Sequence, residues 1–281
     1  LTAATAEQTD DIRKFEEVGT KPEANALAVA EALTFHQAMG GARKQARLLF
    51  LRDTWAKRLA PNPRIKLYTS LRPGVSGNIV MVDVEGTELN PEDRRVLAPP
   101  LVGAVILFTR NFSTVTQLEG LVREIRAVRG PPLLVTVDHE GGRVQRFRKG
   151  FTELPPQRAI GRAYDLDPDA GRRLAWQCGW LLAAELRAAG VDLSFTPCVD
   201  LDYGVSEVIG DRAYHRNPEV VATLAIACMQ GMRAAGMAAV AKHFPGHGAV
   251  VADSHKALPV DRRPLAELGE DLLPYRRLVD N

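Results

Sequence analysis

The chain has 281 residues, of which 46% are hydrophobic, so it can bury a sizeable core and is not a disordered protein. Its 36 Lys and Arg residues nearly balance its 34 Asp and Glu residues, and the net charge of +2 argues against a dedicated nucleic-acid binder. No apolar run approaches the roughly 18 residues of a membrane-spanning helix, and residues 1–15 lack a secretory signal, so a soluble cytoplasmic protein is predicted.

The first 75 residues carry the spacing of amphipathic helices. Apolar positions recur three and four apart in residues 25–36 and again in residues 43–59, so both stretches are predicted to be helical. Residues 72–77 have the composition of a flexible joint because they are rich in glycine, proline and serine. A boundary is therefore predicted near this joint, between a helical segment at 1–75 and a second domain at 78–281.

From residue 78 on, short β-branched runs alternate with helical stretches. The five predicted strands are residues 79–84, 102–108, 133–138, 193–199 and 238–243. Predicted helices lie between them at residues 116–127, 170–189 and 218–235. Such continuously apolar strands suit a parallel sheet that is covered on both faces. The order therefore predicts repeated βα units and an α/β fold.

Polar side chains gather just after the predicted strands. These residues are Asp83, Glu85, Thr109, Arg110, Asn111, Asp138, His139, Glu140, Asp200, Lys242 and His243. A (β/α)8 barrel places its active site at the carboxyl ends of its strands, whereas an open doubly wound sheet concentrates it at one switch point. We therefore predict a TIM-type (β/α)8 barrel. Because only five of its strands are found, this barrel is predicted to be incomplete at its C-terminal end.

The densest chemical signal is the segment KHFPGHGAVVADSHK at residues 242–256. In extended backbone, residues two apart point the same way, so the Asp253 carboxylate is expected beside the His255 ring. A carboxylate neighbour favours the protonated imidazole, which gives a group that donates and accepts protons near neutral pH. The pair is predicted to act as a general acid and base. The alternative is a surface loop whose histidines are solvated.

The same segment offers a metal-binding alternative through His243, His247, Asp253 and His255. Against it, the Pro-Gly pair between the first two histidines denies the helix that would bring them together, and the preceding lysine repels a cation. The three cysteines of the chain have no CxxC spacing, which favours buried thiols over a zinc site or a disulfide framework. No metal is therefore predicted.

A second signal is the segment DHEGGRVQRF at residues 138–147. Asp138 ends a predicted buried strand, and Arg143 and Arg146 return positive charge to the same mouth of the barrel. A carboxylate and a guanidinium can hold neighbouring hydroxyls of a sugar, because the first accepts hydrogen bonds and the second donates them. For Arg143, an ion pair that merely pins the loop is an equal alternative. Arg212, in a later loop, offers a further donor.

Residues 78–281 resemble the bacterial cytoplasmic β-N-acetylhexosaminidases of glycoside hydrolase family 3. The matching segments occur in order and are DVEG at 83–86, GAVILFTRN at 103–111, DHEGGRVQRF at 138–147, residues 192–200, IGDRAYH at 209–215 and KHFPGHGAVVADSH at 242–255. The resemblance implies a barrel that removes non-reducing terminal β-linked N-acetylglucosamine from muropeptides in peptidoglycan recycling. It also implies retention of configuration, no cofactor, no nucleic-acid or membrane partner, and a monomer when complete.

By this resemblance, His255 is the acid/base residue on a mobile loop and Asp253 is its partner. The residues implied to hold the N-acetylglucosamine ring are Asp138, Arg146, Arg212, Lys242 and His243. The family's nucleophile is an aspartate in a Ser-Asp-Asp-Leu-Ser-Met-like segment that does not occur here, so it is expected beyond residue 281. Because retention requires two catalytic groups, the 281-residue chain alone is predicted to be inactive. The alternative is a catalytically silent sugar-binding or structural fragment.

Residues 1–75 resemble a fragment of a class V pyridoxal-phosphate-dependent aminotransferase. The matching stretches are residues 17–20, 24–25, 31–36, 43–59 and 69–72. The Schiff-base lysine segment of that family is not recognisable here, so no cofactor binding is predicted, and a pyridoxal-phosphate enzyme fragment stays an alternative. An ordinary amphipathic helical hairpin is an equal alternative. The joining of two interrupted families gives the further hypothesis of a fused or misassembled reading frame.

Overall fold

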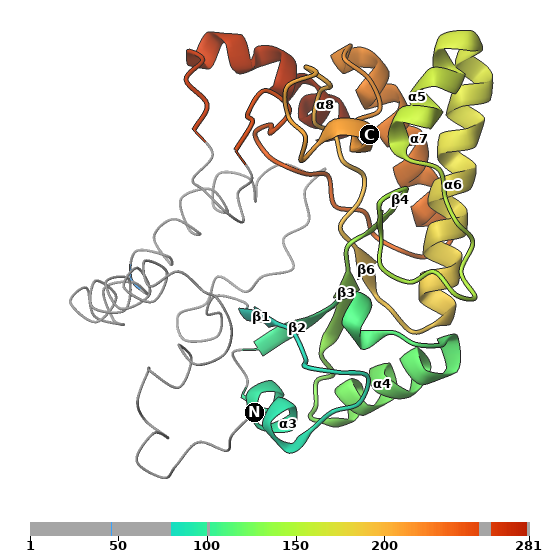
Figure 1. The fold of residues 1–281 in the computed structure, drawn as a ribbon, viewed down its shortest axis with the longest axis vertical. Coiled ribbons are helices and arrows are strands. Elements are labelled where there is room, and N and C mark those ends of the chain that lie inside the picture. The colour runs from blue at the N-terminus through green and yellow to red at the C-terminus, as the bar shows by residue number, and fades with distance from the viewer. Residues whose placement is uncertain (1–45, 47–79, 100–101, 253–259, 280–281) are drawn as a thin grey trace. The chain divides into compact units, whose positions relative to one another are not determined.

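A computed structural model of the chain describes residue 46 and residues 80–99, 102–252 and 260–279, without the side chains of residues 265 and 266. The chain divides into two compact units, Leu1–Asn78 and Ile79–Asn281. All described elements with assigned bounds belong to the second unit (Figure 1). The predicted N-terminal helices and the aminotransferase-like segment lie outside the described residues, apart from residue 46.

The second unit contains a four-stranded parallel sheet, with α4 (Val115–Ala127) and α6 (Pro168–Ala188) beside it (Figure 1). It is formed, in the order β1-β2-β3-β6, by β1 (Val80–Val82), β2 (Val102–Leu107), β3 (Leu134–Val137) and β6 (Leu193–Ser194). The register of β2 and β3 runs from Ala104 opposite Leu134 to Leu107 opposite Val137. Each strand lies within one of the first four predicted strand segments. The predicted parallel βα order is therefore confirmed.

The fifth predicted strand, residues 238–243, runs parallel to β6 and to the segment after it but is not a regular strand. Ala238 pairs with Leu193, and Lys242 pairs with Cys198, through two isolated bridges. The backbone N–H of Lys242 donates to the carbonyl of Pro197 at 3.2 Å. Pro197 itself has no N–H to give to this pairing, which limits its regularity. Over the residues that the structure describes, the sheet stays open and does not close into a barrel.

Six α-helices are described in the second unit. They are α3 (Pro91–Leu97), α4 (Val115–Ala127), α5 (Gln157–Leu166), α6 (Pro168–Ala188), α7 (Pro218–Ala234) and α8 (Gly269–Val279). The three predicted helices are confirmed as α4, α6 and α7. The sequence pattern misses α3, α5 and α8. It also misses an antiparallel hairpin of β4 (His139–Gly141) and β5 (Val144–Gln145), and the short 3₁₀ turns η3 (Thr109–Asn111), η4 (Gly210–Arg212) and η5 (Leu265–Leu268).

Side-chain caps fix the starts of the two longest helices. The carboxylate of Asp167 accepts hydrogen bonds from two backbone N–H groups in the first turn of α6. The side chain of Asn217 accepts one from the N–H of Glu219 at the start of α7. A proline stands at the first position of each helix, where its missing N–H leaves no bond unmade. The sequence therefore specifies locally where both helices begin.

Helices α6 and α7 touch each other through their backbones at two glycines. A Cβ atom placed on Gly179 would lie 2.2 Å from the carbonyl oxygen of Cys228 on α7. A Cβ atom on Gly231 would lie 2.1 Å from the carbonyl oxygen of Trp176 on α6. Real Cβ atoms do not approach backbone this closely, so only glycine fits at either position at this helix separation. The crossing of α6 and α7 is thus set by two residues without side chains.

Two large apolar clusters, beside a third of three residues, hold the elements of the second unit together. The larger one joins the strands to α4 and α6, with fully buried side chains such as Val105, Ile125 and Leu186. The other joins α5, α6 and α7 and includes Ile160 and Leu224. Burial of this kind contributes about 25 cal/mol for each Å² of apolar surface removed from water. Val105 and Val135 thus lie on a face of the sheet that helices cover, whereas Met81 and Leu134 on the other face are 40% and 53% exposed. Over the described residues, the cover predicted for both faces is found on one.

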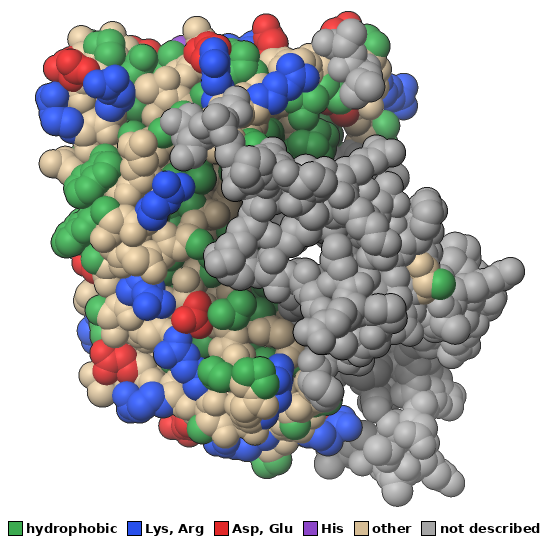
Figure 2. Space-filling model, turned by 180° about the vertical axis from the view of Figure 1, so that it is seen from behind, with side chains coloured by type: hydrophobic (Ala, Val, Ile, Leu, Met, Phe, Trp, Pro, Cys, Tyr) green, Lys and Arg blue, Asp and Glu red, His purple; other side chains and the backbone are tan. Residues whose placement is uncertain are grey.

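The exposed surface carries mixed charge. Figure 2 shows basic and acidic side chains interspersed among apolar ones over the described part of one face. This mixture agrees with the nearly balanced charge of the whole chain, +2. Among the described helices, none combines the length and the continuous apolar character that a membrane crossing requires.

Candidate active site

Two carboxylates at the end of β3 meet one lysine. Asp138 directly follows β3, and Glu140 lies in the hairpin strand β4, so the extended backbone turns both side chains to the same side. Lys242 comes from the segment that pairs with the chain after β6. Its Nζ lies 2.6 Å from Oδ1 of Asp138 and 2.5 Å from Oε1 of Glu140. The three residues thus form one compact charged group at the carboxyl ends of the strands.

Arg212 joins this group from η4. Its Nε and Nη2 donate to the two oxygens of Glu140 at 2.9 and 2.8 Å, which is a bidentate pair. Its Nη1 donates to the carbonyl of Val208 at 3.0 Å. Burial alone would lower the pKa of Arg212, but the hydrogen bonds and the charge of Glu140 outweigh burial and raise it. The guanidinium is therefore a permanent cation held in one orientation.

Glu140 lies beneath both cations. Burial alone would raise the pKa of its carboxyl, but the hydrogen bond from Arg212 and the charge of Lys242 hold that pKa below the usual value. Glu140 is thus ionised at neutral pH although its side chain is only 2% exposed. A buried carboxylate with two cationic partners fixes the positions of both.

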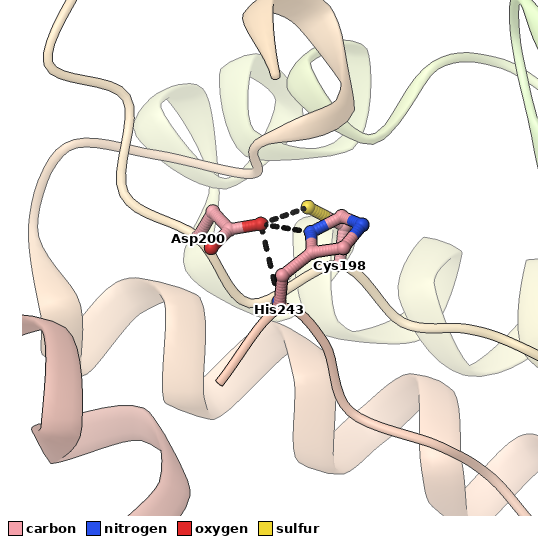
Figure 3. Close-up of side chains that lie close together, drawn as sticks. All are labelled: Cys198, Asp200 and His243. Atoms are coloured by element: carbon pink, nitrogen blue, oxygen red, sulfur yellow. Dashed lines mark hydrogen bonds and ion pairs between the residues drawn. The ribbon is translucent and has the colours of Figure 1, made fainter. Parts of the chain in front are cut away.

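His243 follows Lys242 and contacts a second buried carboxylate, that of Asp200 (Figure 3). The His243 Nδ1 lies 2.6 Å from Oδ2 of Asp200, and its other ring nitrogen, Nε2, lies 3.3 Å from Nη2 of Arg212. The Cys198 thiol is 3.2 Å from the same Oδ2, and the backbone N–H of His247 donates to Oδ1 at 2.7 Å. Burial alone would raise the pKa of Asp200, but these hydrogen bonds, with that of His243 the largest, lower it.

The exposed fractions of the side chains separate a surface layer from a buried layer. The side chains of His243 and Asp138 are 35% and 25% exposed, and those of Lys242 and Arg212 are 14% and 11% exposed. The side chains of Glu140 and Asp200 are 2% and 0% exposed. A ligand at the mouth can therefore reach two hydrogen-bond acceptors and two cationic donors, whereas the buried carboxylates act through them.

Arg146 lies apart from these residues. It makes no hydrogen bond to Asp138, Arg212, Lys242 or His243, and its buried Nε has no partner among the described residues. It lines a separate cavity of about 380 Å³ beside the loop after β2. Of the five residues predicted to hold a sugar ring, the structure therefore brings four together and leaves Arg146 outside their hydrogen-bond network.

Arg143 has the loop-pinning role that the sequence allows as an alternative. Its Nε donates to Oδ1 of Asp211 at 2.9 Å, and its Nη2 contacts the carbonyl oxygens of Glu207, Val208 and Ile209 at 2.9, 2.6 and 3.2 Å. These bonds engage Nε and Nη2 of Arg143 in holding the loop. The predicted acid/base pair, Asp253 and His255, lies outside the described residues, so the geometry of that pair stays a prediction.

One group of potential metal ligands occurs in the described part of the chain. The ligand atoms of Cys198, Asp200 and His243 lie within 4.8 Å of one another. They do not fit a cation, because they already bond to one another and the Arg212 guanidinium faces the remaining ring nitrogen. Burial also raises the pKa of the Cys198 thiol well above its usual value, whereas a metal needs the thiolate. The bonding and the protonation of these three side chains therefore disagree with a metal centre at this position.

The structure places His243 and His247 of the metal alternative, whereas Asp253 and His255 lie outside the described residues, so that alternative stays open. The Pro-Gly turn does not keep the rings apart, since their centroids lie 6.1 Å from each other. The loop itself brings them together. Asp200 occupies Nδ1 of His243, whereas the two ring nitrogens of His247 have no hydrogen-bond partner among the described residues.

The sequence analysis assigns no role to the two buried carboxylates, those of Glu140 and Asp200, although the sequence holds signals for both. Glu140 stands two residues after Asp138 in an extended segment, so it must face the same side. Asp200 follows the fourth predicted strand, at the same edge of the sheet. Polar residues that follow buried strands indicate where a site lies. Sequence spacing does not show which distant residues they contact.

The chain matches the model of a known family and several named proteins. The family model described as glycosyl hydrolase family 3 N terminal domain matches residues 75–281. A beta-hexosaminidase of Thioalkalivibrio sulfidiphilus is 63% identical over 200 residues, which cover 71% of this chain and 58% of that protein. A beta-hexosaminidase of Nitrosospira multiformis is 58% identical over 201 residues, which cover 71% of this chain and 58% of that protein.

Solved structures agree with these matches. The structure of NagZ from Neisseria gonorrhoeae in complex with N-trifluoroacetyl-D-glucosamine is 50% identical with a TM-score of 0.70, over 72% of this chain and 60% of that chain. A glycoside hydrolase family 3 beta-N-acetylglucosaminidase from Paenibacillus sp. is 35% identical with a TM-score of 0.66, over 71% and 38%. The chain thus spans three fifths or less of the length of these relatives.

The family match covers the whole second unit and includes every residue of the charged cluster. The N-terminal domain of this family is a TIM-like α/β barrel, which confirms the predicted barrel type, with a sheet that stays open over the described residues. By these matches and by its parallel βα architecture, this chain belongs to glycosyl hydrolase family 3.

Proposed function

We propose that this chain is part of a retaining glycoside hydrolase that removes non-reducing terminal β-linked N-acetylglucosamine. The observation that carries the proposal is the convergence of Asp138, Lys242, Arg212 and His243 at the strand ends of a family 3 chain. The names of the relatives support it, since they are beta-hexosaminidases and a beta-N-acetylglucosaminidase.

The ring of the sugar would lie against the exposed layer of the cluster. The Asp138 carboxylate would accept a hydrogen bond from a ring hydroxyl, and Lys242 and Arg212 would donate to neighbouring oxygens. Because the same three groups already contact one another or Glu140, they are held in place before a sugar binds. Such preorganisation reduces the cost of binding.

The chemistry would come from residues other than this cluster. We propose that His255, with Asp253 as its partner, moves the proton, and that an aspartate beyond residue 281 is the nucleophile. We further propose muropeptides as substrates, with peptidoglycan recycling in the cytoplasm as the process and a monomer as the complete form. The resemblance of residues 78–281 supports these proposals.

Replacement of Lys242 by methionine tests the sugar site. The change should weaken binding of N-acetylglucosamine about tenfold to a hundredfold, because it removes a charged donor between two carboxylates. Isothermal titration calorimetry with the free sugar measures the affinity. Lys149→Met, at an exposed position after β5, is the matched control and should bind like the wild type. Equal affinities for both variants would contradict the proposed site.

A second candidate function is sugar binding without turnover. The observation that favours it is the absence from the 281-residue sequence of the nucleophile segment that the family resemblance implies. We expect this chain to release no p-nitrophenol from p-nitrophenyl β-N-acetylglucosaminide, because one of the two groups needed for retention is missing. Absorbance of the released phenolate measures turnover. Release above the rate of a Lys242→Met sample would show that the chain carries its own nucleophile.

A further inference from the structure

His243 differs from the other cluster residues in how it is held. It is the most exposed of them at the mouth, yet its ring is bonded to the fully buried Asp200 (Figure 3). That carboxylate is itself anchored by backbone, because it accepts the N–H groups of His247 at 2.7 Å and of His243 at 3.3 Å. The direction of the ring is therefore tied to the loop that carries it.

The neighbours of the ring determine where its proton lies. Asp200 is ionised, so its Oδ2 only accepts, and the His243 Nδ1 at 2.6 Å must carry a hydrogen. On the other side, the Arg212 guanidinium only donates, so the His243 Nε2 at 3.3 Å must present a lone pair. Two independent partners thus select the same neutral tautomer.

We infer that Asp200 is a positioning residue, which holds His243 as the Nδ1–H tautomer and keeps its Nε2 as a hydrogen-bond acceptor at the mouth of the site. The inference rests on the proposed function, since a hydroxyl of the bound sugar would replace Arg212 as the donor to the single lone pair of Nε2. A histidine in the other tautomer would present an N–H toward both Arg212 and that hydroxyl. The cluster would then lose one of its two exposed acceptors.

Replacement of Asp200 tests this role in the 281-residue chain. In Asp200→Ala, Nδ1 loses its acceptor, so the Nε2–H tautomer should become populated and the affinity for N-acetylglucosamine should fall about tenfold. In Asp200→Asn, the amide oxygen can still accept from Nδ1, so tautomer and affinity should be partly restored. Long-range ¹H–¹⁵N correlation spectra of ¹⁵N-histidine-labelled protein report the tautomer, and calorimetry with the free sugar reports the affinity.

Cys198→Ala is the matched control. It removes the thiol that lies 3.2 Å from the same Oδ2 but leaves the acceptor for His243, so tautomer and affinity should stay within twofold of the wild type. The wild-type spectrum decides the inference even if Asp200→Ala does not fold. An Nε2–H signal for His243 in the wild type would overturn the positioning role while leaving the proposed function intact. An Nδ1–H signal without any affinity for N-acetylglucosamine would overturn the proposed function and the sugar-facing role of Nε2 with it.

Discussion

Replacement of Glu140 by alanine should lower the free energy of unfolding by about 3–5 kcal/mol. The carboxylate is bonded to Lys242 at 2.5 Å and to Arg212 at 2.8 and 2.9 Å, and all three side chains are largely buried. Without it, two cations remain in a poorly hydrated place with Asp138 as the nearest remaining counter-charge. The loss should also abolish sugar binding, because Lys242 and Arg212 lose their common anchor.

Chemical denaturation of the purified chain measures this change. Glu153→Ala is the matched control, since that glutamate is 75% exposed and its ion pair with Arg148 spans 3.5 Å. Exposed pairs contribute at most about 1 kcal/mol. If both variants lose the same small amount of stability, Glu140 is not the anchor of the cluster.

The effect of Glu140 should also depend on pH. Its pKa in the folded chain is below the usual 4.5, so its charge stabilises the fold fully above pH 4.5 and progressively less as the pH falls through the folded value. The stability difference between the wild type and Glu140→Gln should therefore be constant near neutral pH and shrink under acid conditions. A difference that grows with acidification would reverse the sign of this linkage.

Replacement of Gly179 by alanine should cost about 3 kcal/mol of stability, at the upper end of the 1–3 kcal/mol usual for overpacking. The added methyl group would lie 2.2 Å from the carbonyl oxygen of Cys228, and backbone cannot rotate away as a side chain can. To make room for the methyl group, helices α6 and α7 would have to move apart at the point where Gly179 and Gly231 let their backbones touch. The melting temperature and the denaturation midpoint should both fall.

Gly120→Ala is the control for this prediction. Gly120 also lies inside a helix, α4, but the nearest atom to its added methyl group would be Nη2 of Arg123 at 3.9 Å. Without a clash, the better helix propensity of alanine should raise stability by up to about 1 kcal/mol. Opposite signs for the two substitutions would show that the close contact, rather than helix propensity, decides the outcome at Gly179. Two gains of similar size would mean that the helices separate freely.

The order of strands and long helices along the chain can be predicted from local sequence pattern, whereas several shorter elements cannot. Strands β1, β2 and β3 are mainly apolar and one face of their sheet packs against helices, and such short apolar runs leave a clear signal in the sequence. Helix α8 contains Pro274, which normally interrupts a helix, and α5 contains Gly161. Helix α3 has only seven residues, although its capping box at Asn90 gave a usable signal. Weak or contradictory local signals hide such elements.

The sequence predicts most residues of the candidate site, but it does not predict which of them bond to one another. Spacing and strand ends place Asp138, Lys242 and His243 at one edge of the sheet, and the structure brings them together. Glu140 joins the cluster through contacts with Arg212 and Lys242, which lie 72 and 102 positions later in the chain. No local sequence pattern encodes contacts over such separations. The same limit explains Arg146, whose position on a hairpin turns it toward a separate cavity.

The two loops at the mouth are fastened to each other at two separate points. Arg143 in the β4–β5 hairpin binds the backbone of residues 207–209 and pairs with Asp211, while Arg212 of that second loop reaches back to Glu140. Neither loop can swing outward without breaking a guanidinium contact. The conformational entropy of both loops is therefore lost when the chain folds, so that little of it remains to be lost when a ligand arrives.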